Sequence, residues 1–176
     1  MTKLNEVLEY AKMKHGSQRR RGGELYYNHV VEVGEVAKAI ALKMVGEYTF
    51  LQADIEFIEY AGILHDTIED TNTNYDIIAE LVNTKVADWV SFLSNDKRLP
   101  REYRRALYDK IIRSACIQVK IIKLADVYSN LVGIRGTEGD IWISGFKEKS
   151  RKVLEFLSDE LSKTTVFLEC IKMVNR

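Results

Sequence analysis

The amino-acid sequence predicts an all-α protein. Apolar residues recur at helical spacing along most of the chain, whereas strand-like alternation flanked by turn dipeptides is scarce. The 176 residues include one proline, Pro100, so proline seldom interrupts a helix. The length fits one domain, and a hydrophobic content of 46% is enough for a core. We therefore expect residues 1–176 to form a single helical bundle.

The first two helices are expected over residues 3–14 and 28–45. The apolar stripe of the first comprises Leu4, Val7, Leu8 and Ala11. The segment "GSQRRRGGE" ends that helix, because it combines three glycines with a basic run. Asn28 is a candidate cap for the second helix, which would place His29 in its first turn.

A third helix is expected over residues 53–66, ending at or just after His65-Asp66. "TNTN", "SNDKRLP" and "RGTEGD" read as loops, and Pro100 suits the first turn of the helix that follows it. The remaining helices are expected over 75–82, 84–94, 101–116, 117–133 and 142–174, the last range holding one or two helices.

Composition excludes several classes of protein. Lys+Arg and Asp+Glu both number 26, which argues against a whole-surface nucleic-acid binder. The N-terminus lacks the apolar core of a signal peptide, and no apolar stretch approaches the ~20 residues of a membrane span. Cys116 and Cys170 are expected to be small buried thiols in a reducing compartment. We expect a cytoplasmic protein with no nucleic-acid or membrane partner.

Three segments place a metal-grade ligand within or beside an apolar helix: His29, His65-Asp66 and Asp126. Charged residues are seldom buried unless they are paired or bound to metal. A lysine or a helix cap could satisfy one buried aspartate, but three such segments favour a shared ion. Two imidazoles and two carboxylates suit manganese or another divalent transition ion, with positions left for water and substrate.

Glu69 and Asp70 follow within a turn of His65-Asp66. A carboxylate near a metal-bound water can act as general base. The alternative is a solvated acidic helix end. If the helix continues for a turn, Glu69 and Asp70 share faces with His65 and Asp66, and if it breaks they still lie within one turn of them. Acids are better placed at helix N-termini than at C-termini, so their position is unfavourable unless a cation lies nearby.

Basic residues cluster in "QRRRGGELYYNH", where Arg19, Arg20 and Arg21 precede two glycines. Guanidinium groups bind phosphate bidentately, so this cluster is a candidate phosphate clamp. The alternative is a solvated basic turn. A second basic segment, "SNDKRLPREYRR", contains Lys97 and is equally ambiguous from its residues alone.

Taken together, these motifs resemble a known family. "HDTIEDT" is similar to the HD signature of the RelA/SpoT-type alarmone hydrolases, a branch of the HD-domain phosphohydrolases. "KHGSQRRRGGELYYNH", "SNDKRLP" and "KLADVYSNL" resemble other blocks of that family, in order, across roughly residues 8 to 135. The length resembles the stand-alone small alarmone hydrolases.

The resemblance implies a helical hydrolase with one manganese ion that removes the 3′-pyrophosphate from guanosine tetra- or pentaphosphate, giving pyrophosphate and GDP or GTP. It also implies roles for ten residues: His29, His65, Asp66 and Asp126 as metal ligands, Glu69 and Asp70 for the attacking water, Arg20 and Arg21 beside the nucleotide, Asn130 at the nucleoside and Lys97 near the phosphates.

The sequence departs from the family pattern at Leu25 and Val30, where proline is common, and at Val132, where arginine is usual. Arg135, one turn further on, is a candidate replacement for that arginine. These changes leave open an adenine alarmone, or NADPH as a 2′-phosphate substrate. A silent nucleotide-binding module is a third possibility, which loss of Glu69 or Asp70 would have favoured. The oligomeric state stays open.

Overall fold

Helices form every regular element of the computed structural model, which describes residues 2–134 and 139–176. The predicted all-α class is therefore confirmed. Within these ranges the only extended pairing is an isolated bridge between Arg19 and Leu25. The elements are α1 (Lys3–His15), α2 (Tyr26–Met44), the 3₁₀ helix η1 (Thr49–Ala53), α3 (Ile55–Leu64), α4 (Thr67–Asp70), α5 (Tyr75–Leu81), α6 (Thr84–Leu93), α7 (Arg101–Ser114), α8 (Ile117–Val132), α9 (Asp140–Leu161) and α10 (Thr165–Val174).

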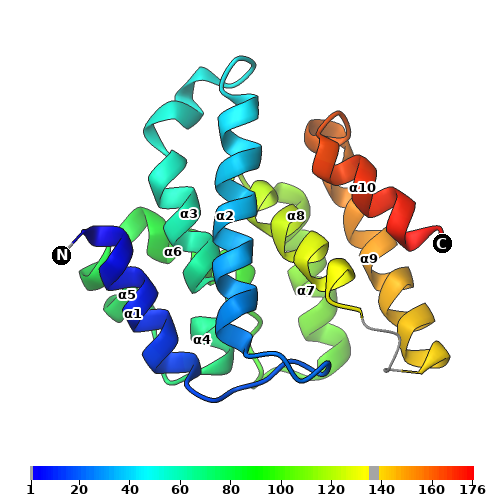
Figure 1. The fold of residues 1–176 in the computed structure, drawn as a ribbon, viewed down its shortest axis with the longest axis horizontal. Helices are drawn as coiled ribbons and strands as arrows, with labels where there is room; N and C mark the ends of the chain where they lie inside the picture. The colour runs from blue at the N-terminus through cyan, green and yellow to red at the C-terminus, as the bar shows by residue number, and fades with distance from the viewer. Residues whose placement is uncertain (1, 135–138) are drawn as a thin grey trace.

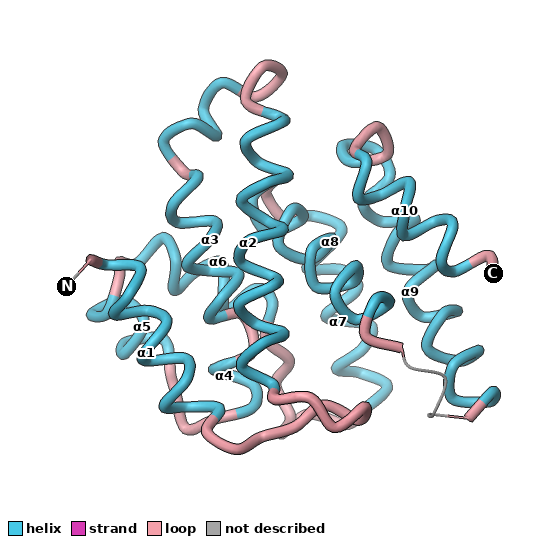
Figure 2. The backbone as a smooth tube through the Cα atoms, in the orientation of Figure 1, coloured by secondary structure: helices cyan, strands magenta, loops and turns pink. Residues whose placement is uncertain are grey.

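Helix α2 runs through the middle of the bundle (Figure 1). It packs against α3 on one side and α8 on the other, while α6 contacts both α3 and α8. Helices α9 and α10 pack against each other and against α8, at the opposite side of the molecule from α1 (Figure 2). The segment between α1 and α2, which carries the arginine cluster, runs across one end of the bundle. No helix in the described ranges has the length and apolar character needed to cross a bilayer.

Several expected boundaries are corrected. Helix α2 begins at Tyr26, so Asn28 lies inside its first turn and the prediction that it caps the helix was wrong. The loop makes the side-chain cap unnecessary, because the Gln18 carbonyl accepts the Tyr26 N–H at 2.8 Å. Pro100 occupies the N-cap position of α7, one residue before the expected first turn. The range 142–174 holds two helices, and η1 was not expected.

Two other expectations also need comment. Cys170 is buried, but Cys116 is exposed, because it occupies the N-cap position of α8. The prediction of two buried thiols was therefore wrong for Cys116. The central part of the "RGTEGD" loop, including Arg135, lies outside the described residues.

Helices α2 and α3 approach most closely at two glycines. A Cβ on Gly34 would come within 2.6 Å of Ile63 Cγ1 and 2.9 Å of a carbonyl oxygen of α3. A Cβ on Gly62 would come within 2.8 Å of the Gly34 Cα. The contact therefore has no room for a side chain on either helix. It also sets how closely His29, before Gly34, approaches His65, after Gly62.

We expect Gly34→Ala to lower the free energy of unfolding by about 1–3 kcal/mol, because overpacking forces the two helices apart. Gly145→Ala is the matched control, since it lies inside α9 and no described atom stands within 4 Å of its added Cβ. That control should gain about 0.5–1 kcal/mol from helix propensity. Urea denaturation measures both. Equal stability of Gly34→Ala and the wild type would contradict the close contact.

Candidate metal centre and active site

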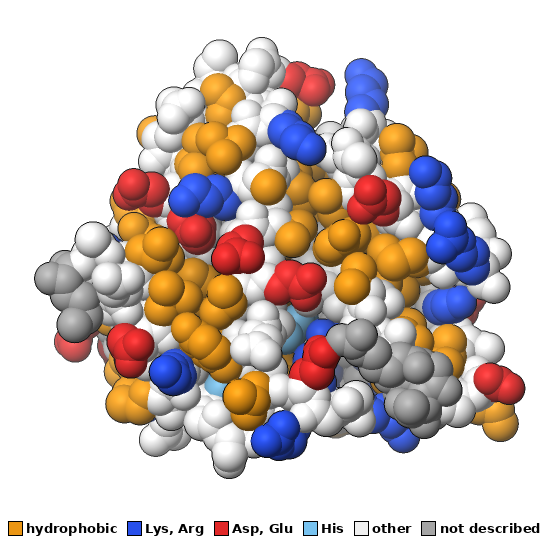
Figure 3. All heavy atoms as spheres, in the orientation of Figure 1, with side chains coloured by type: hydrophobic (Ala, Val, Ile, Leu, Met, Phe, Trp, Pro, Cys, Tyr) orange, Lys and Arg blue, Asp and Glu red, His pale blue; other side chains and the backbone are white. Residues whose placement is uncertain are grey.

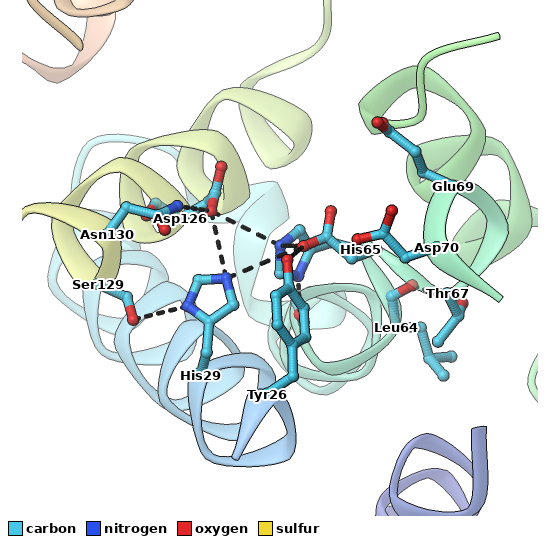
Figure 4. Close-up of polar contacts among 12 residues, drawn as sticks. Tyr26, His29, Leu64, His65, Thr67, Glu69, Asp70, Asp126, Ser129 and Asn130 are labelled. Atoms are coloured by element: carbon cyan, nitrogen blue, oxygen red, sulfur yellow. Dashed lines mark hydrogen bonds and ion pairs between the residues drawn. The ribbon is translucent and has the colours of Figure 1, made fainter. Parts of the chain in front are cut away.

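Three separate parts of the fold bring imidazoles and carboxylates to one point. His29 comes from the first turns of α2, His65-Asp66 from the break between α3 and α4, and Asp126 from α8. The His29 Nε2 lies 3.5 Å from Asp126 Oδ1 and 3.9 Å from Asp66 Oδ2. The His65 Nε2 lies 3.7 Å from Asp126 Oδ1 and 2.9 Å from Asp66 Oδ2. Figure 4 shows His29, His65 and Asp126 pointing toward one another.

The hydrogen bonding of His65 leaves one ring nitrogen for a cation. Its Nδ1 donates to the Gly62 carbonyl at 2.8 Å, so in the neutral ring the single proton is on Nδ1 and the lone pair is on Nε2. The side chain is buried, and Nε2 finds no hydrogen-bond partner among the described residues. Asp66 Oδ2, although close, lies outside hydrogen-bonding geometry. An orphaned lone pair facing two carboxylates fits a divalent cation.

The charge balance of this cluster also favours a cation. Burial by itself lowers the pKa of His65, but the carboxylates of Asp66 and Asp126 outweigh it and raise that pKa to about 10. Burial raises the pKa of Asp66, yet His65 brings it down to about 2. The cluster therefore attracts positive charge, which can be a proton or a metal ion in its place.

Neighbouring side chains hold each carboxylate in place. Tyr26 Oη donates to Asp66 Oδ2 at 2.5 Å. Lys123 Nζ donates to Asp126 Oδ2 at 2.9 Å, and Asn130 Nδ2 donates to Asp126 Oδ1 at 2.5 Å. Tyr26 and Lys123 were not singled out from the sequence. The available signal was their spacing, because each lies three residues before a candidate ligand on the same helix.

The two acids after the HD pair lie in a new helix. Because α3 ends at Leu64 and α4 begins at Thr67, Glu69 and Asp70 belong to the first turn of α4. Asp70 is also the last residue of this four-residue helix, so the two acids do lie at a helix end, but in a helix separate from α3. The chain breaks at His65-Asp66, where the Thr67 hydroxyl donates to the Leu64 carbonyl at 2.7 Å.

The carboxylates of Glu69 and Asp70 have their own partners. Glu69 Oε2 accepts from the Asn95 backbone N–H at 2.9 Å and from Asn95 Nδ2 at 3.0 Å. Lys97 Nζ lies 2.5 Å from Asp70 Oδ1 and 3.8 Å from Glu69 Oε1. In Figure 4 Glu69 stands apart from the histidines. The loop after α6 thus supports both acids and brings a lysine to them.

Arg20 and Arg21, the predicted basic pair, lie on the other side of the cluster from Lys97. Arg20 Nη2 donates to Asn130 Oδ1 at 2.9 Å, and its guanidinium rests on Gly133, where a Cβ would come within 2.5 Å of Nη1. Arg21 lies over the Trp142 ring, 4.9 Å from its centroid. Asn130 is thus bonded to both Asp126 and Arg20. Its i, i+4 spacing on α8 indicates the first contact, whereas nothing in the sequence indicates the second.

Two cavities open beside the cluster. The first, of about 160 Å³, is bordered by Arg20, Arg21, Gly22, Tyr26, Asn130, Gly133, Ile134, Trp142 and Phe146. The Trp142 and Phe146 rings stack in its wall, with centroids 5.2 Å apart. The second, of about 330 Å³, is lined by residues that include His29 and Glu32. Figure 3 shows the face of the molecule that is turned to the viewer in Figure 1, and histidine atoms are visible near its centre between acidic and basic side chains.

Comparison with known proteins assigns the family. Residues 26–131 match the model of the HD domain, which spans all four candidate ligands. The chain belongs to the HD-domain family. It is 32% identical over 141 residues to guanosine-3′,5′-bis(diphosphate) 3′-pyrophosphohydrolase MESH1 of Danio rerio, covering 79% of this chain and 73% of the relative.

Three further matches share the length or the fold of this chain. MESH1 of Drosophila melanogaster is 28% identical over 170 residues, which cover 95% of this chain and 89% of that one. A solved structure described as a metazoan ortholog of SpoT that hydrolyses ppGpp matches with a TM-score of 0.78 at 25% identity, covering 99% of this chain and 95% of the other. A Listeria monocytogenes protein with a TM-score of 0.65 and 21% identity shares the fold.

We expect Lys123→Met to destabilise the metal-free HD domain by about 3–5 kcal/mol, because it leaves the buried Asp126 carboxylate without its cation. The side chains of Lys123 and Asp126 are only 16% and 12% exposed. Lys152→Met removes an exposed partner of Asp109 and should cost no more than about 1 kcal/mol. Urea denaturation in EDTA compares them. Similar losses in both variants would show that Lys123 does not compensate a buried charge.

Proposed function

We propose that this HD domain hydrolyses guanosine 3′-diphosphate 5′-di- or triphosphate to pyrophosphate and GDP or GTP, with one Mn²⁺ ion. The observation that carries the proposal is the group of His29, His65 and Asp66, whose candidate ligand atoms all lie within 4.8 Å of one another. Asp126 Oδ1 lies 3.5 Å from His29 Nε2, and His65 Nε2 is orphaned. It is supported by relatives named as 3′-pyrophosphohydrolases of guanosine bis(diphosphate), which this chain matches over most of their length.

His29, His65, Asp66 and Asp126 would hold the ion. An N₂O₂ ligand set suits manganese better than a structural zinc site, which more often uses cysteine, and neither cysteine lies in the cluster. When bound, such an ion polarises a phosphoryl oxygen and lowers the pKa of coordinated water. Tyr26, Lys123 and Asn130 would keep the two aspartates oriented through the hydrogen bonds they donate.

Glu69 and Asp70 would orient and deprotonate the attacking water. The water oxygen forms a bond to the 3′-phosphorus, the bond from that phosphorus to the ribose O3′ breaks, and O3′ takes up a proton. Asn95 donates two hydrogen bonds to one oxygen of Glu69, which limits its rotation. Lys97, bonded to Asp70, lies where it can attract phosphate oxygens.

The nucleoside would lie on the other side of the metal, by Arg20, Arg21 and Asn130. The small cavity there combines guanidinium groups with stacked aromatic rings, which suits a purine base and its phosphates. Tyr26 and Asn130 both line this cavity and bond to a candidate metal ligand. A nucleotide bound there would therefore reach the metal centre directly.

We further propose that residues 1–176 form one domain. Helices α9 and α10 lie beyond the matched HD segment, yet both pack on α8, which carries Asp126. Trp142 and Phe146 of α9 also border the cavity next to the metal centre. The C-terminal helices would thus complete the substrate site.

The decisive experiment is a turnover assay with guanosine tetraphosphate, in Mn²⁺ and in EDTA, that resolves the nucleotide products. We expect GDP and pyrophosphate in equal amounts with Mn²⁺ and no turnover in EDTA. His65→Ala and Asp126→Ala should lose both turnover and Mn²⁺ binding. A wild type that binds Mn²⁺ but leaves guanosine tetraphosphate intact while hydrolysing an adenine alarmone or NADPH would refute the proposed substrate.

We expect Glu69→Gln to retain Mn²⁺ but to hydrolyse guanosine tetraphosphate at least about 10²-fold more slowly, because the amide cannot take a proton from water. Calorimetric titration with Mn²⁺ and single-turnover kinetics separate the two effects. Glu80→Gln is the control, since Glu80 is exposed on α5. Near wild-type kcat in Glu69→Gln would remove Glu69 from the proton transfer.

A further inference from the structure

Glu32 and Ser129 form a hydrogen-bonded pair that the proposed reaction does not use. Ser129 lies on α8 and is fully buried, whereas Glu32 lies on α2 at the wall of the larger cavity. The Ser129 hydroxyl donates to Glu32 Oε2 across the α2–α8 interface. The same hydroxyl oxygen lies 2.9 Å from His29 Nδ1, a contact drawn in Figure 4.

The number of available protons decides which group donates and which accepts in each of these hydrogen bonds. A serine hydroxyl has one proton, and a carboxylate can only accept. Since Ser129 donates to Glu32, its oxygen must accept from His29, so the proton of the neutral His29 ring sits on Nδ1. The lone pair is then on Nε2, which faces Asp66 and Asp126 at 3.9 and 3.5 Å.

We propose that Glu32 and Ser129 are positioning residues that hold His29 as its Nδ1–H tautomer and aim Nε2 at the metal centre; the inference rests on the proposed function of that centre. His65 reaches the same tautomer through the Gly62 carbonyl. Within the part of the chain that the structure describes, His29 Nδ1 has Ser129, a side chain of another helix, as its partner in place of a carbonyl. Helix α8 therefore supplies one ligand, Asp126, and supports a second.

The chemistry of metal-bound histidine explains why this matters. A hydrogen bond from the far ring nitrogen to a carboxylate, carbonyl or water fixes the ring and raises the basicity of the ligating nitrogen. Here a hydroxyl stands between the imidazole and the carboxylate. Glu32 thus acts on His29 only through Ser129. We call this arrangement, in which His29 bonds Ser129 and Ser129 bonds Glu32, the relay; it differs from two helix contacts that act independently.

The test measures Mn²⁺ affinity by calorimetric titration for Ser129→Ala, Glu32→Gln and the double variant. We expect Ser129→Ala to weaken Mn²⁺ binding by about 10- to 100-fold and Glu32→Gln to weaken it less. The double variant should match Ser129→Ala, because Glu32 has no effect once the hydroxyl is gone. Glu35→Gln, an exposed glutamate on the same helix, should bind like the wild type.

A second readout reports the tautomer directly. In the protein loaded with diamagnetic Zn²⁺, the His29 Nδ1–H should give a proton resonance protected from solvent exchange. With three histidines in the chain, the imidazole resonances are few enough to assign. We expect Ser129→Ala to remove the protection and Ser129→Thr, which keeps the hydroxyl, to restore part of it. A contact that merely joined two helices would leave this resonance unchanged.

The proposal would be overturned if Ser129→Ala bound Mn²⁺ with wild-type affinity. It would also be overturned if the fold-losses of Mn²⁺ affinity in the two single variants multiplied in the double variant. If Ser129→Ala does not fold, the Mn²⁺ affinity and the His29 Nδ1–H resonance of Glu32→Gln test the proposal instead. Wild-type values for both would overturn it. A wild type that binds Mn²⁺ but spares guanosine tetraphosphate would refute the proposed reaction alone. A wild type without a saturable Mn²⁺ site would overturn both.

Discussion

The close contact of α2 with α3 at Gly34 and Gly62 is the constraint on which the candidate site depends. Because neither glycine has a side chain, the two backbones meet where any Cβ would clash. His29 precedes Gly34 and His65 follows Gly62, and because the two helices run antiparallel (Figure 1) both histidines lie at the same end of this contact. The helix separation therefore sets the distance between their rings. Their centroids are 5.3 Å apart. A wider crossing would separate two of the four candidate ligands.

The second determinant is the break in the helix at His65-Asp66. A continuous helix would have placed His65-Asp66 and the acids Glu69 and Asp70 on one helical axis. Instead, a separate helix, α4, begins at Thr67. Glu69 accepts two hydrogen bonds from Asn95, in the loop after α6. The candidate site therefore has two parts, the cluster of imidazoles and carboxylates and an acidic pair with Lys97, each with its own hydrogen-bond partners.

Several polar groups of the candidate site find their partners in other parts of the fold. Asp66 receives a hydrogen bond from Tyr26 of α2, and His29 is bonded to Ser129 of α8. Arg20, in the loop before α2, reaches Asn130 of α8. These bonds join segments that are 40 to 110 residues apart. Satisfying the polar groups of the site therefore also fixes how α2 and α8 pack.

The sequence by itself determined the helical class, most helix positions and the identity of the HD motif. Helix formation follows the local spacing of apolar residues, and the motif resides in neighbouring residues, so both are visible without a fold. Tertiary structure decided the start of α2, the exposure of Cys116 and the placement of Glu69 and Asp70 in a new helix, α4. It also decided the partners of Glu69, Arg20 and Ser129. Those outcomes depend on which distant groups the packed helices bring within hydrogen-bond distance, and no local pattern encodes that choice.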